Sequence, residues 1–375
     1  MLFIKIELNL NSLATQLILS NYLGSIAIGQ IFWGFISEKI GRVHCLRIGA
    51  SLFCLGSTMT ACSISHWMLM LTSLWMGFGA ASCITMARAI VNEQFNHVMA
   101  AKYLSNMTSV MVLVPMLGFF IGGLIVEIFG WRLGIAFVGI FGFILTVSTF
   151  TMLDSRQEET KLNLSIKIIG IIILHLLSNH RFLIFCTISS LQAGIFFSFH
   201  SFLPYQFYRL GLTPTDYGVW FSLTSAGYFL GNLFNRWLTD KIKLEVIIFW
   251  GCAGGTVAIL FLLISYLIGF EHPLFLAIPL FFFGLGNGLI IANCLVCAMK
   301  CADPYGASAS GILGAVQFGM GSLAGSVIII VNGDVSFSKS LTVILSMSFA
   351  SFLIIIFLIQ KQDKIFGNKM RQSTR

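Results

Sequence analysis

Charged residues are scarce in this chain of 375 residues, where Asp, Glu, Lys and Arg together make up only 10%. Soluble domains carry about 25% charged residues, so this scarcity excludes an ordinary water-soluble protein. The sequence is instead 57% hydrophobic, with a mean hydropathy of +0.92. Its apolar runs are near-continuous and long enough to cross a bilayer, which favours helices over the alternation of a barrel. We therefore expect an all-α polytopic membrane protein.

The apolar runs predict eleven membrane spans. No signal-peptide pattern precedes the first span, because the segment from Met1 to Leu10 is too short and too charged for one. The predicted spans cover about 14–36, 45–63, 67–90, 104–127, 133–153, 182–206, 216–236, 244–268, 273–298, 307–331 and 340–360.

The basic residues predict the orientation, since Lys and Arg gather on the cytoplasmic side of a membrane. If the loop after the first span is cytoplasmic, 18 of the 22 Lys and Arg lie inside, and the C-terminus is cytoplasmic. The net charge of +8 then reflects topology, and nucleic-acid binding is not expected. The four exceptions are Lys5, Arg132, Arg209 and Lys339.

The nine cysteines and seven histidines do not form the clusters that metal binding or catalysis needs. Cys294, Cys297 and Cys301 have a metal-like spacing, but no His stands beside them, so we expect no metal site and no cofactor. The histidines are scattered over loops and span ends, whereas an intramembrane enzyme needs reactive groups at one depth. An enzyme is therefore not expected.

An internal repeat divides the chain. Residues 29–40 match residues 231–242 without a gap, at an offset of 202 residues, and each segment ends a span with an acid and a lysine. Parallel repeats of this kind are typical of one large class of transporters. The predicted domains are an N-terminal bundle of about five spans (1–153), a linker with an interfacial helix (154–181), a C-terminal bundle of six spans (182–360) and a basic tail (361–375).

The two halves are unequal in this prediction. Subtracting 202 from the first span of the second half places its counterpart at about −20 to 4, so the first helix of the first half is expected to be missing. Two explanations stay open: the start is drawn too late, or the protein has lost the helix.

The loop after the first predicted span resembles motif A of the major facilitator superfamily. It combines Gly34, Glu38, Gly41 and Arg42. We expect Gly34 to allow a close helix contact, and Glu38 to meet a helix N-terminus or Arg42 and hold a closed state.

A second stretch resembles motif C of the antiporters in that superfamily. It contains Pro115, which is expected to kink its span, and three glycines that allow bending against a neighbour: Gly118, Gly122 and Gly123. With Ala87–Glu93 and Gly306–Gly314, these motifs make residues 7–330 similar to the bicyclomycin-resistance (Bcr/CflA) family of drug:proton antiporters.

This resemblance implies a fold of two pseudo-symmetric helical bundles in the bacterial inner membrane, normally with twelve spans and as a monomer. It implies export of small amphiphilic drugs in exchange for protons. Two departures affect the coupling: the first span, which commonly carries the proton-binding acid, is missing, and Ser73 stands at the usual motif B Arg, with Met76 at the usual Gln.

No ionised side chain lies near the middle of a predicted span, where it would cost at least about 2.5–3.5 kcal/mol. This favours neutral or cationic amphiphiles as substrates. His200 is the proton-coupling candidate, because histidine changes charge near neutral pH. The polar or aromatic residues that could bind substrate are Gln16, Asn21, Gln192, His200, Tyr228, Asn287 and Gln317.

Three alternatives stay open at this point. The protein could take up a small nutrient, it could be an inactive remnant of a transporter, or each polar candidate could serve helix packing alone, at about 0.6 kcal/mol for each hydrogen bond. The residues do not identify the substrate.

Overall fold

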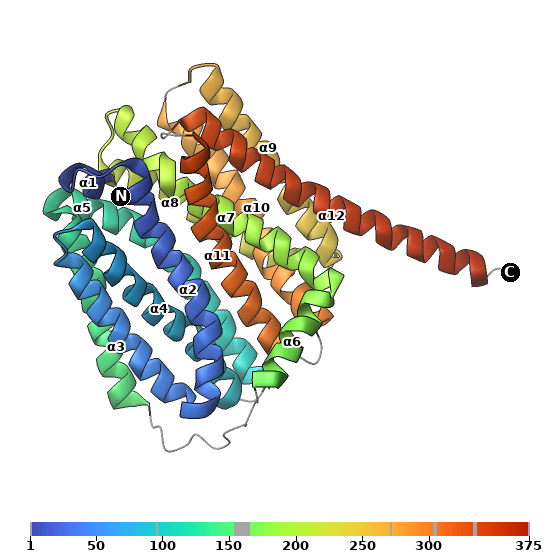
Figure 1. The fold of residues 1–375 in the computed structure, drawn as a ribbon. Helices are drawn as coiled ribbons and strands as arrows, with labels where there is room; N and C mark the ends of the chain where they lie inside the picture. Colours follow the sequence, from blue (N-terminus) through green and yellow to red (C-terminus); the bar gives the residue numbers. More distant parts are fainter. Residues whose placement is uncertain are drawn as a thin grey trace.

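A computed structural model describes residues 2–94, 97–153, 166–270, 272–302, 306–332 and 336–373, and Figure 1 shows its fold. The described chain is entirely helical, which confirms the predicted fold class. Its elements are α1 (Leu2–Glu7), α2 (Ser12–Ile40), α3 (Arg42–Ala61), α4 (His66–Gln94), α5 (His97–Met152), α6 (Ile166–Ser178), α7 (His180–Arg209), α8 (Pro214–Leu238), α9 (Leu244–Leu267), α10 (Pro273–Cys301), α11 (Gly306–Asn332) and α12 (Phe337–Ser373).

α5 accounts for two of the predicted spans. Its backbone leaves the helical region at Gly130, where φ is +81°, and this break divides it into arms of residues 97–129 and 131–152. A positive φ of this size is easily adopted only by glycine, so the turn depends on that residue. Pro115 lies within the first arm, where the helical backbone is continuous, and the expected bend of the helix there stays a prediction.

Eight segments of the described chain are long and apolar enough to cross a membrane, which supports a multi-pass membrane protein. α3 and α8 fall outside this set. α3 begins with Arg42, His44 and Arg47, and α8 ends with Asn235 and Arg236, so both helices carry polar residues at the predicted cytoplasmic end.

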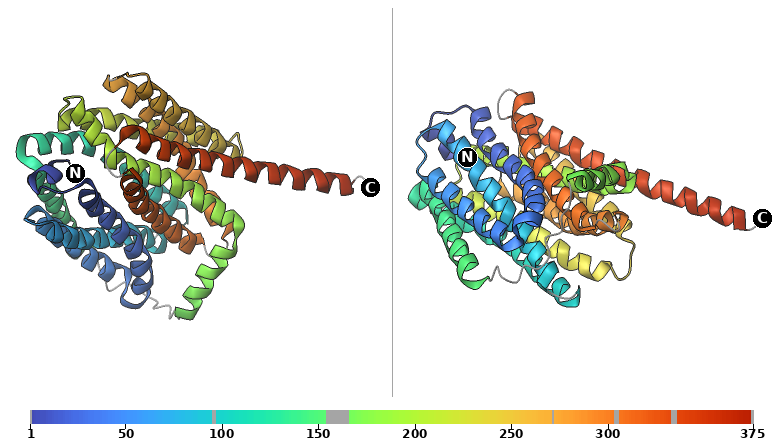
Figure 2. Two further views of the ribbon diagram at one scale, coloured as in Figure 1. Left: turned by 45° about the horizontal axis from the view of Figure 1, so that its top comes forward. Right: turned by 60° about the horizontal axis from the view of Figure 1, so that its bottom comes forward.

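The helices of the two halves pack in matching pairs. α2 packs on α4 and α3 on α4, just as α8 packs on α10 and α9 on α10. Between the halves α2 packs on α11, and α5 packs on α8. The helix starts match as well: Asn11 caps α2 and Thr213, 202 residues later, caps α8. Figure 2 shows the bundle from two further directions.

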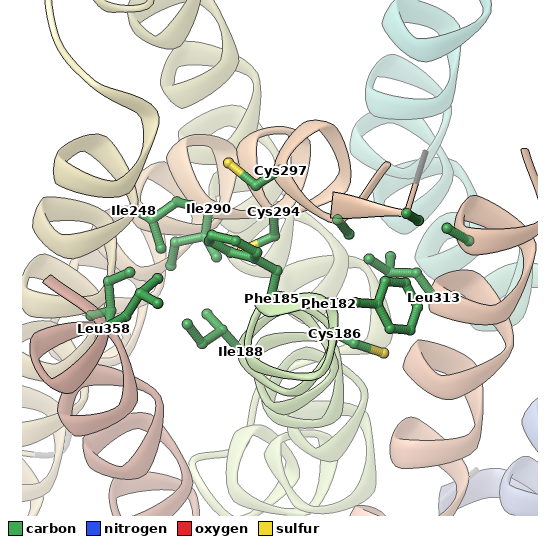
Figure 3. Packing of buried hydrophobic residues seen from close by; sticks show 14 of the residues in the cluster. Phe182, Phe185, Cys186, Ile188, Ile248, Ile290, Cys294, Cys297, Leu313 and Leu358 are labelled. Carbon is green, nitrogen blue, oxygen red and sulfur yellow. The ribbon is translucent and has the colours of Figure 1, made fainter. Parts of the chain in front are cut away.

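One of two buried apolar clusters in the second half surrounds the first part of α7. α7, α9, α10, α11 and α12 all contribute apolar side chains to it, including Phe182, Phe185 and Ile290 (Figure 3). Cys294 and Cys297 belong to this apolar cluster. α7 is central because it packs on α10, α11 and α12 at once.

The linker and the tail are described only in part. Residues 154–165 of the predicted linker lie outside the described residues, and α6 forms the rest of it as a helix that contacts α7. Its location at the membrane interface stays a prediction. α12 extends past the bundle, so most of the predicted tail is helical backbone (Figure 1).

Candidate functional site

A contact between α2 and α11 joins the two halves. Ser20 Oγ lies 2.7 Å from Ser326 Oγ, and Ser322 donates to the Ser20 carbonyl at 2.6 Å. A Cβ on Gly325 would lie 2.2 Å from Gln16 Nε2, which shows how closely the helices cross. Small and hydroxyl residues thus bring the two backbones together, as is common between membrane helices.

This contact continues only partway along the two antiparallel helices. A Cβ on Gly314 would lie 2.6 Å from Gln30 Oε1, and this contact is the one nearest the motif A end of α2. One turn further, Gly34 of α2 and Gly311 of α11 have no atom of the described residues within 4 Å of their Cβ positions. The helices therefore separate toward the end that carries motif A, and the described residues make no close contact at Gly34 in this conformation.

The motif A loop is a tight turn held by charge. Gly41 has φ +92° and its N–H donates to the Ser37 carbonyl, which ends α2 and starts α3. Glu38 and Arg42 form an ion pair at 2.5 Å, and Arg42 also donates to Ser37 Oγ. Glu38 thus takes the Arg42 partner, one of the two expected for it.

The three glycines of motif C have different surroundings. A Cβ on Gly123 would lie 2.4 Å from the Pro214 carbonyl oxygen, so this glycine allows α5 to cross the start of α8. Gly118 and Gly122 have nothing within 4 Å among the described residues. They face a groove of about 410 Å³ between α1, both arms of α5, the end of α7 and the start of α8.

His200 lies where both halves meet. Its Nδ1 is 3.3 Å from the hydroxyl oxygen of Tyr217, and its ring stacks on Phe119 of α5 at 5.3 Å between centroids. Phe196 and Phe221 complete an aromatic surround. Phe119 and Tyr217 also line the groove, so His200 lies directly behind its wall.

The other candidates do not converge on His200. Gln16 donates to Ser20 at 3.3 Å, beside the α2–α11 contact. Asn21 donates to the Met70 carbonyl of α4 at 2.7 Å, and Gln192 donates to Ser351 of α12 at 2.8 Å, so both bond within their own half.

Tyr228, Asn287 and Gln317 have other surroundings. The Tyr228 carbonyl accepts from Asn232 within α8. Asn287 Oδ1 and Gln317 Nε2 are buried and have no hydrogen-bond partner among the described residues. Buried polar atoms are normally paired, so these two atoms require water or another ligand. The roles of all seven candidates stay predictions.

Ser73, at the position of the motif B Arg, is buried and donates to the Met70 carbonyl of its own helix.

Two features were not predicted from the sequence. One is the serine stripe of α11 formed by Ser322 and Ser326, whose spacing of four residues could have marked a polar face. The other is the clamp on α1: Glu7 accepts hydrogen bonds from Trp131 and Arg132, which follow the Gly130 break. These two donors lower the pKa of the Glu7 carboxylate below its ordinary value.

The chain is similar in sequence to known resistance proteins. Over 326 residues it is 22% identical to a bicyclomycin resistance protein homolog of Haemophilus influenzae, covering 86% of this chain and 81% of that one. Over 126 residues it is 27% identical to multidrug resistance protein D of Escherichia coli, covering 34% and 32%.

Solved structures share the fold. A D-xylose-proton symporter superposes with a TM-score of 0.74 at 15% identity, covering 92% of this chain and 88% of that one. A peptide transporter superposes with a TM-score of 0.75 at 13% identity, covering 96% and 87%. Residues 1–326 match the Major Facilitator Superfamily, and the chain is a member of that family of membrane transporters.

Proposed function

We propose that this protein exports small amphiphilic molecules from the bacterial cytoplasm in exchange for protons, by alternating access in the inner membrane. The two bundles, residues 1–153 and 182–360, rock against each other as bodies, with the C-terminus cytoplasmic. Export is favoured by the motif C glycines and by similarity to proteins named for bicyclomycin and multidrug resistance.

The observation that carries alternating access is the one-sided contact between α2 and α11. The helices touch from Gln16 to Gln30 and separate at Gly34 and Gly311. This geometry corresponds to a state open at the motif A end, which the basic residues predict to be cytoplasmic. The opposite state requires Gly34 and Gly311 to approach, and glycines at both positions leave room for that.

His200 is the proposed proton carrier. It sits between α5, α7 and α8, so a change in its charge acts on groups from both halves. The aromatic rings around His200 offer no counter-ion to the protonated imidazole. A movement of the bundles that admits water or substrate would therefore change the protonation of His200.

Transport is tested by expressing the chain in a drug-sensitive bacterium and following accumulation of a labelled amphiphilic antibiotic, with and without an uncoupler. We expect lower accumulation than in cells with empty vector, and loss of the difference on uncoupling. His200→Gln should abolish the difference, while His180→Gln, an exposed position at the start of α7, should not.

Unchanged accumulation with the protein present in the membrane would contradict export. Uptake or an inactive remnant would then be the remaining functions. Export that survives in His200→Gln would move proton coupling to another group.

The gate is tested separately by cysteine cross-linking. We expect the pair Gly34→Cys and Gly311→Cys to cross-link slowly in the resting protein and faster when labelled antibiotic is present. A Gly34→Cys and Gly254→Cys pair is the control, since Gly254 lies exposed on α9. Equal rates with and without antibiotic would exclude closure at these positions.

A further inference from the structure

The crossing of α5 and α8 joins the two halves at the end opposite motif A, which the basic residues predict to face outside. A Cβ on Gly123 of α5 would lie 2.4 Å from the Pro214 carbonyl oxygen, so the two backbones are close there. One turn further along α5, Glu127 Oε2 accepts a hydrogen bond from the backbone N–H of Thr215 at 3.1 Å. A carboxylate of the first half thus binds the first turn of a helix in the second half.

The first turn of α8 leaves one backbone donor for an acceptor from outside the helix. Pro214 has no N–H, the N–H of Thr213 donates to Asp216 Oδ2, and the N–H of Asp216 donates to Thr213 Oγ1. The Thr215 N–H is the remaining donor, and Glu127 binds it. Because the start of a helix carries partial positive charge, the ionised carboxylate is the favoured form there. A protonated carboxyl group is a weaker acceptor, so uptake of a proton weakens the contact.

The internal repeat shows that the two crossings between the halves differ in charge. At the offset of 202 residues, Gly123 corresponds to Gly325 of α11 and Glu127 corresponds to Ile329. Ile329 is a buried apolar residue, and the described contact between α2 and α11 is made by the neutral hydroxyl groups of Ser20 and Ser326. A proton can therefore weaken the α5–α8 contact at Glu127, whereas the corresponding position of α11 cannot bind one.

The same turn of α8 also contacts His200. Tyr217 follows Thr215 by two residues, and its hydroxyl oxygen lies 3.3 Å from His200 Nδ1. A movement of this turn away from α5 would therefore break the Glu127 contact and displace the hydrogen-bond partner of His200 together. Glu127 is exposed, whereas His200 lies behind the wall of the groove, so a proton from outside reaches Glu127 first.

Other ionisable groups lie near the outer ends of the elements packed on α5 and α8. They are Asp216 and Tyr217 of α8, Lys5 and Glu7 of α1, Arg132 of the second arm of α5, Cys62 after α3, His66 of α4, His200 and Arg209 of α7, and His272 before α10. Among the described residues none of these groups forms an ion pair with Glu127, since Glu7 and Arg132 pair with each other. The Thr215 N–H is therefore the group that stabilises the Glu127 charge at this crossing.

We propose that Glu127 binds a proton from the outer side of the membrane, and that this proton releases α8 from α5 and favours the state open to the outside. The proton passes from external water to the carboxylate, so proton binding and the contact with Thr215 compete. The contact is present above the pH at which Glu127 takes up a proton and is lost below it. The proposal rests on the alternating access and proton exchange proposed above, and it adds to His200 a site where external acidity acts on α8.

The test measures opening of the outer side by the reaction of Ser20→Cys with a membrane-impermeant maleimide, in right-side-out vesicles and in a chain that also carries Cys62→Ser. Ser20 is buried at the α2–α11 crossing, and Cys62 is the exposed one among the nine cysteines. Glu127→Gln should raise the rate about twofold to fivefold at neutral pH, because the amide lacks the charge that binds the helix start. Asp216→Asn is the matched control and should leave the rate unchanged, since Asp216 bonds within α8.

Acidification should act through the same residue. The reactivity of every thiol falls with pH, so the Ser20→Cys rate is divided by the rate of native Cys62, measured in the chain that retains Ser20. This ratio should rise from about pH 7 to about pH 4, the range in which a glutamate takes up its proton. With Glu127→Gln it should stay constant over the same range.

Closure of the inner side provides an independent readout. The pair Gly34→Cys and Gly311→Cys should cross-link faster with Glu127→Gln, because opening outside requires closure inside. A faster Ser20→Cys reaction without faster inner cross-linking would overturn the proposal, since only the start of α8 would then have moved. Unchanged rates in Glu127→Gln, or an equal rise in Asp216→Asn, would overturn it too, as would a pH response that persists in Glu127→Gln.

These measurements are made without drug, so this proposal and export can fail separately. A protein that exports drug but has unchanged rates in Glu127→Gln would contradict the role of Glu127 alone. A protein that shows the rate changes but exports no drug would contradict export alone, and Glu127 would still control the outer side.

Discussion

α5 and α11 occupy equivalent positions in the two halves, yet their surroundings differ. None of residues 113–129 of α5 is buried, whereas α11 buries Ala309, Leu313, Ala315, Ala324, Ile328 and Ile329. Gly194 of α7 fits between Met320, Ala324 and Met347, whereas Gly118 and Gly122 of α5 face open space. At the α7–α11 contact of the second half, glycine therefore allows close packing, whereas the glycines of the equivalent helix α5 lie on an open face.

The difference also separates two kinds of stabilisation. Both halves have backbone-close glycine crossings, but the second half adds two large apolar clusters that share α7, whereas the first half has smaller apolar clusters and the polar clamp at α1. A glycine packed against backbone cannot be replaced by a larger residue without a loss of stability, whereas a glycine on an open face can.

The largest effect is expected at the α8–α10 crossing. A Cβ on Gly284 would lie 2.0 Å from the Thr224 carbonyl oxygen, so Gly284→Leu should cost about 3 kcal/mol or more and lower the yield of folded protein. Gly118→Leu meets open space and should be neutral or slightly stabilising. Thermal unfolding in detergent measures the stability of both variants. Equal stabilities would contradict the expected difference between Gly284, which packs against backbone, and Gly118, which faces open space.

A smaller effect is expected at the turn between α2 and α3. Gly41 has φ +92° and ψ 153°, a region almost restricted to glycine, whereas Lys243, at the equivalent start of α9, has φ −61°. Gly41→Ala should therefore destabilise by about 1–3 kcal/mol. Gly254→Ala, in an open helical position, should stabilise by about 0.5–1 kcal/mol. A Gly41→Ala protein that unfolds at the parent temperature would show that the turn can relax.

Helix positions were predictable from the sequence, because an apolar run of bilayer length can do little else than form a helix. The family was predictable too, since Gly34–Arg42 and Pro115–Gly123 carry its motifs. α1 was not predicted, because six residues are too few for a periodic pattern.

The partners of polar residues were not predictable. A polar residue in a span indicates its depth, but the helix rotation decides which neighbour it meets. Gln192 and Asn21 turn toward α12 and α4 within their own halves, whereas Ser20 and Ser326, which carried no sequence signal strong enough to select them, join the two halves.

The contact between Ser20 and Ser326 predicts a modest shift of the gate. Ser326→Ala removes a hydrogen bond worth about 0.6 kcal/mol, so the population with Gly34 and Gly311 close together should rise about threefold. The rate of the Gly34→Cys and Gly311→Cys cross-link measures it. Ser346→Ala, an exposed serine that bonds within α12, is the matched control. An unchanged rate would show that this bond is equally strong in both states.

The smallest effect is expected at the clamp of α1, because both Glu7 and Arg132 are exposed and solvent screens their attraction. The hydrogen bonds from Trp131 and Arg132 hold the pKa of Glu7 below its ordinary value of 4.5, so the ionised form is the one that docks. The stabilisation is complete above that value and is lost as the pH falls through the lowered pKa of the docked state.

A nitroxide label at Ile6→Cys, an exposed position on α1, reports this docking by its mobility. The label should be restrained at neutral pH and become mobile as the pH falls below 4.5. With Glu7→Gln it should be mobile throughout, because a neutral amide accepts more weakly from Arg132. If the label stays restrained in Glu7→Gln, then Phe3 and Ile4 hold α1 by packing in the groove, and the first half resembles the second more closely than its polar clamp indicates.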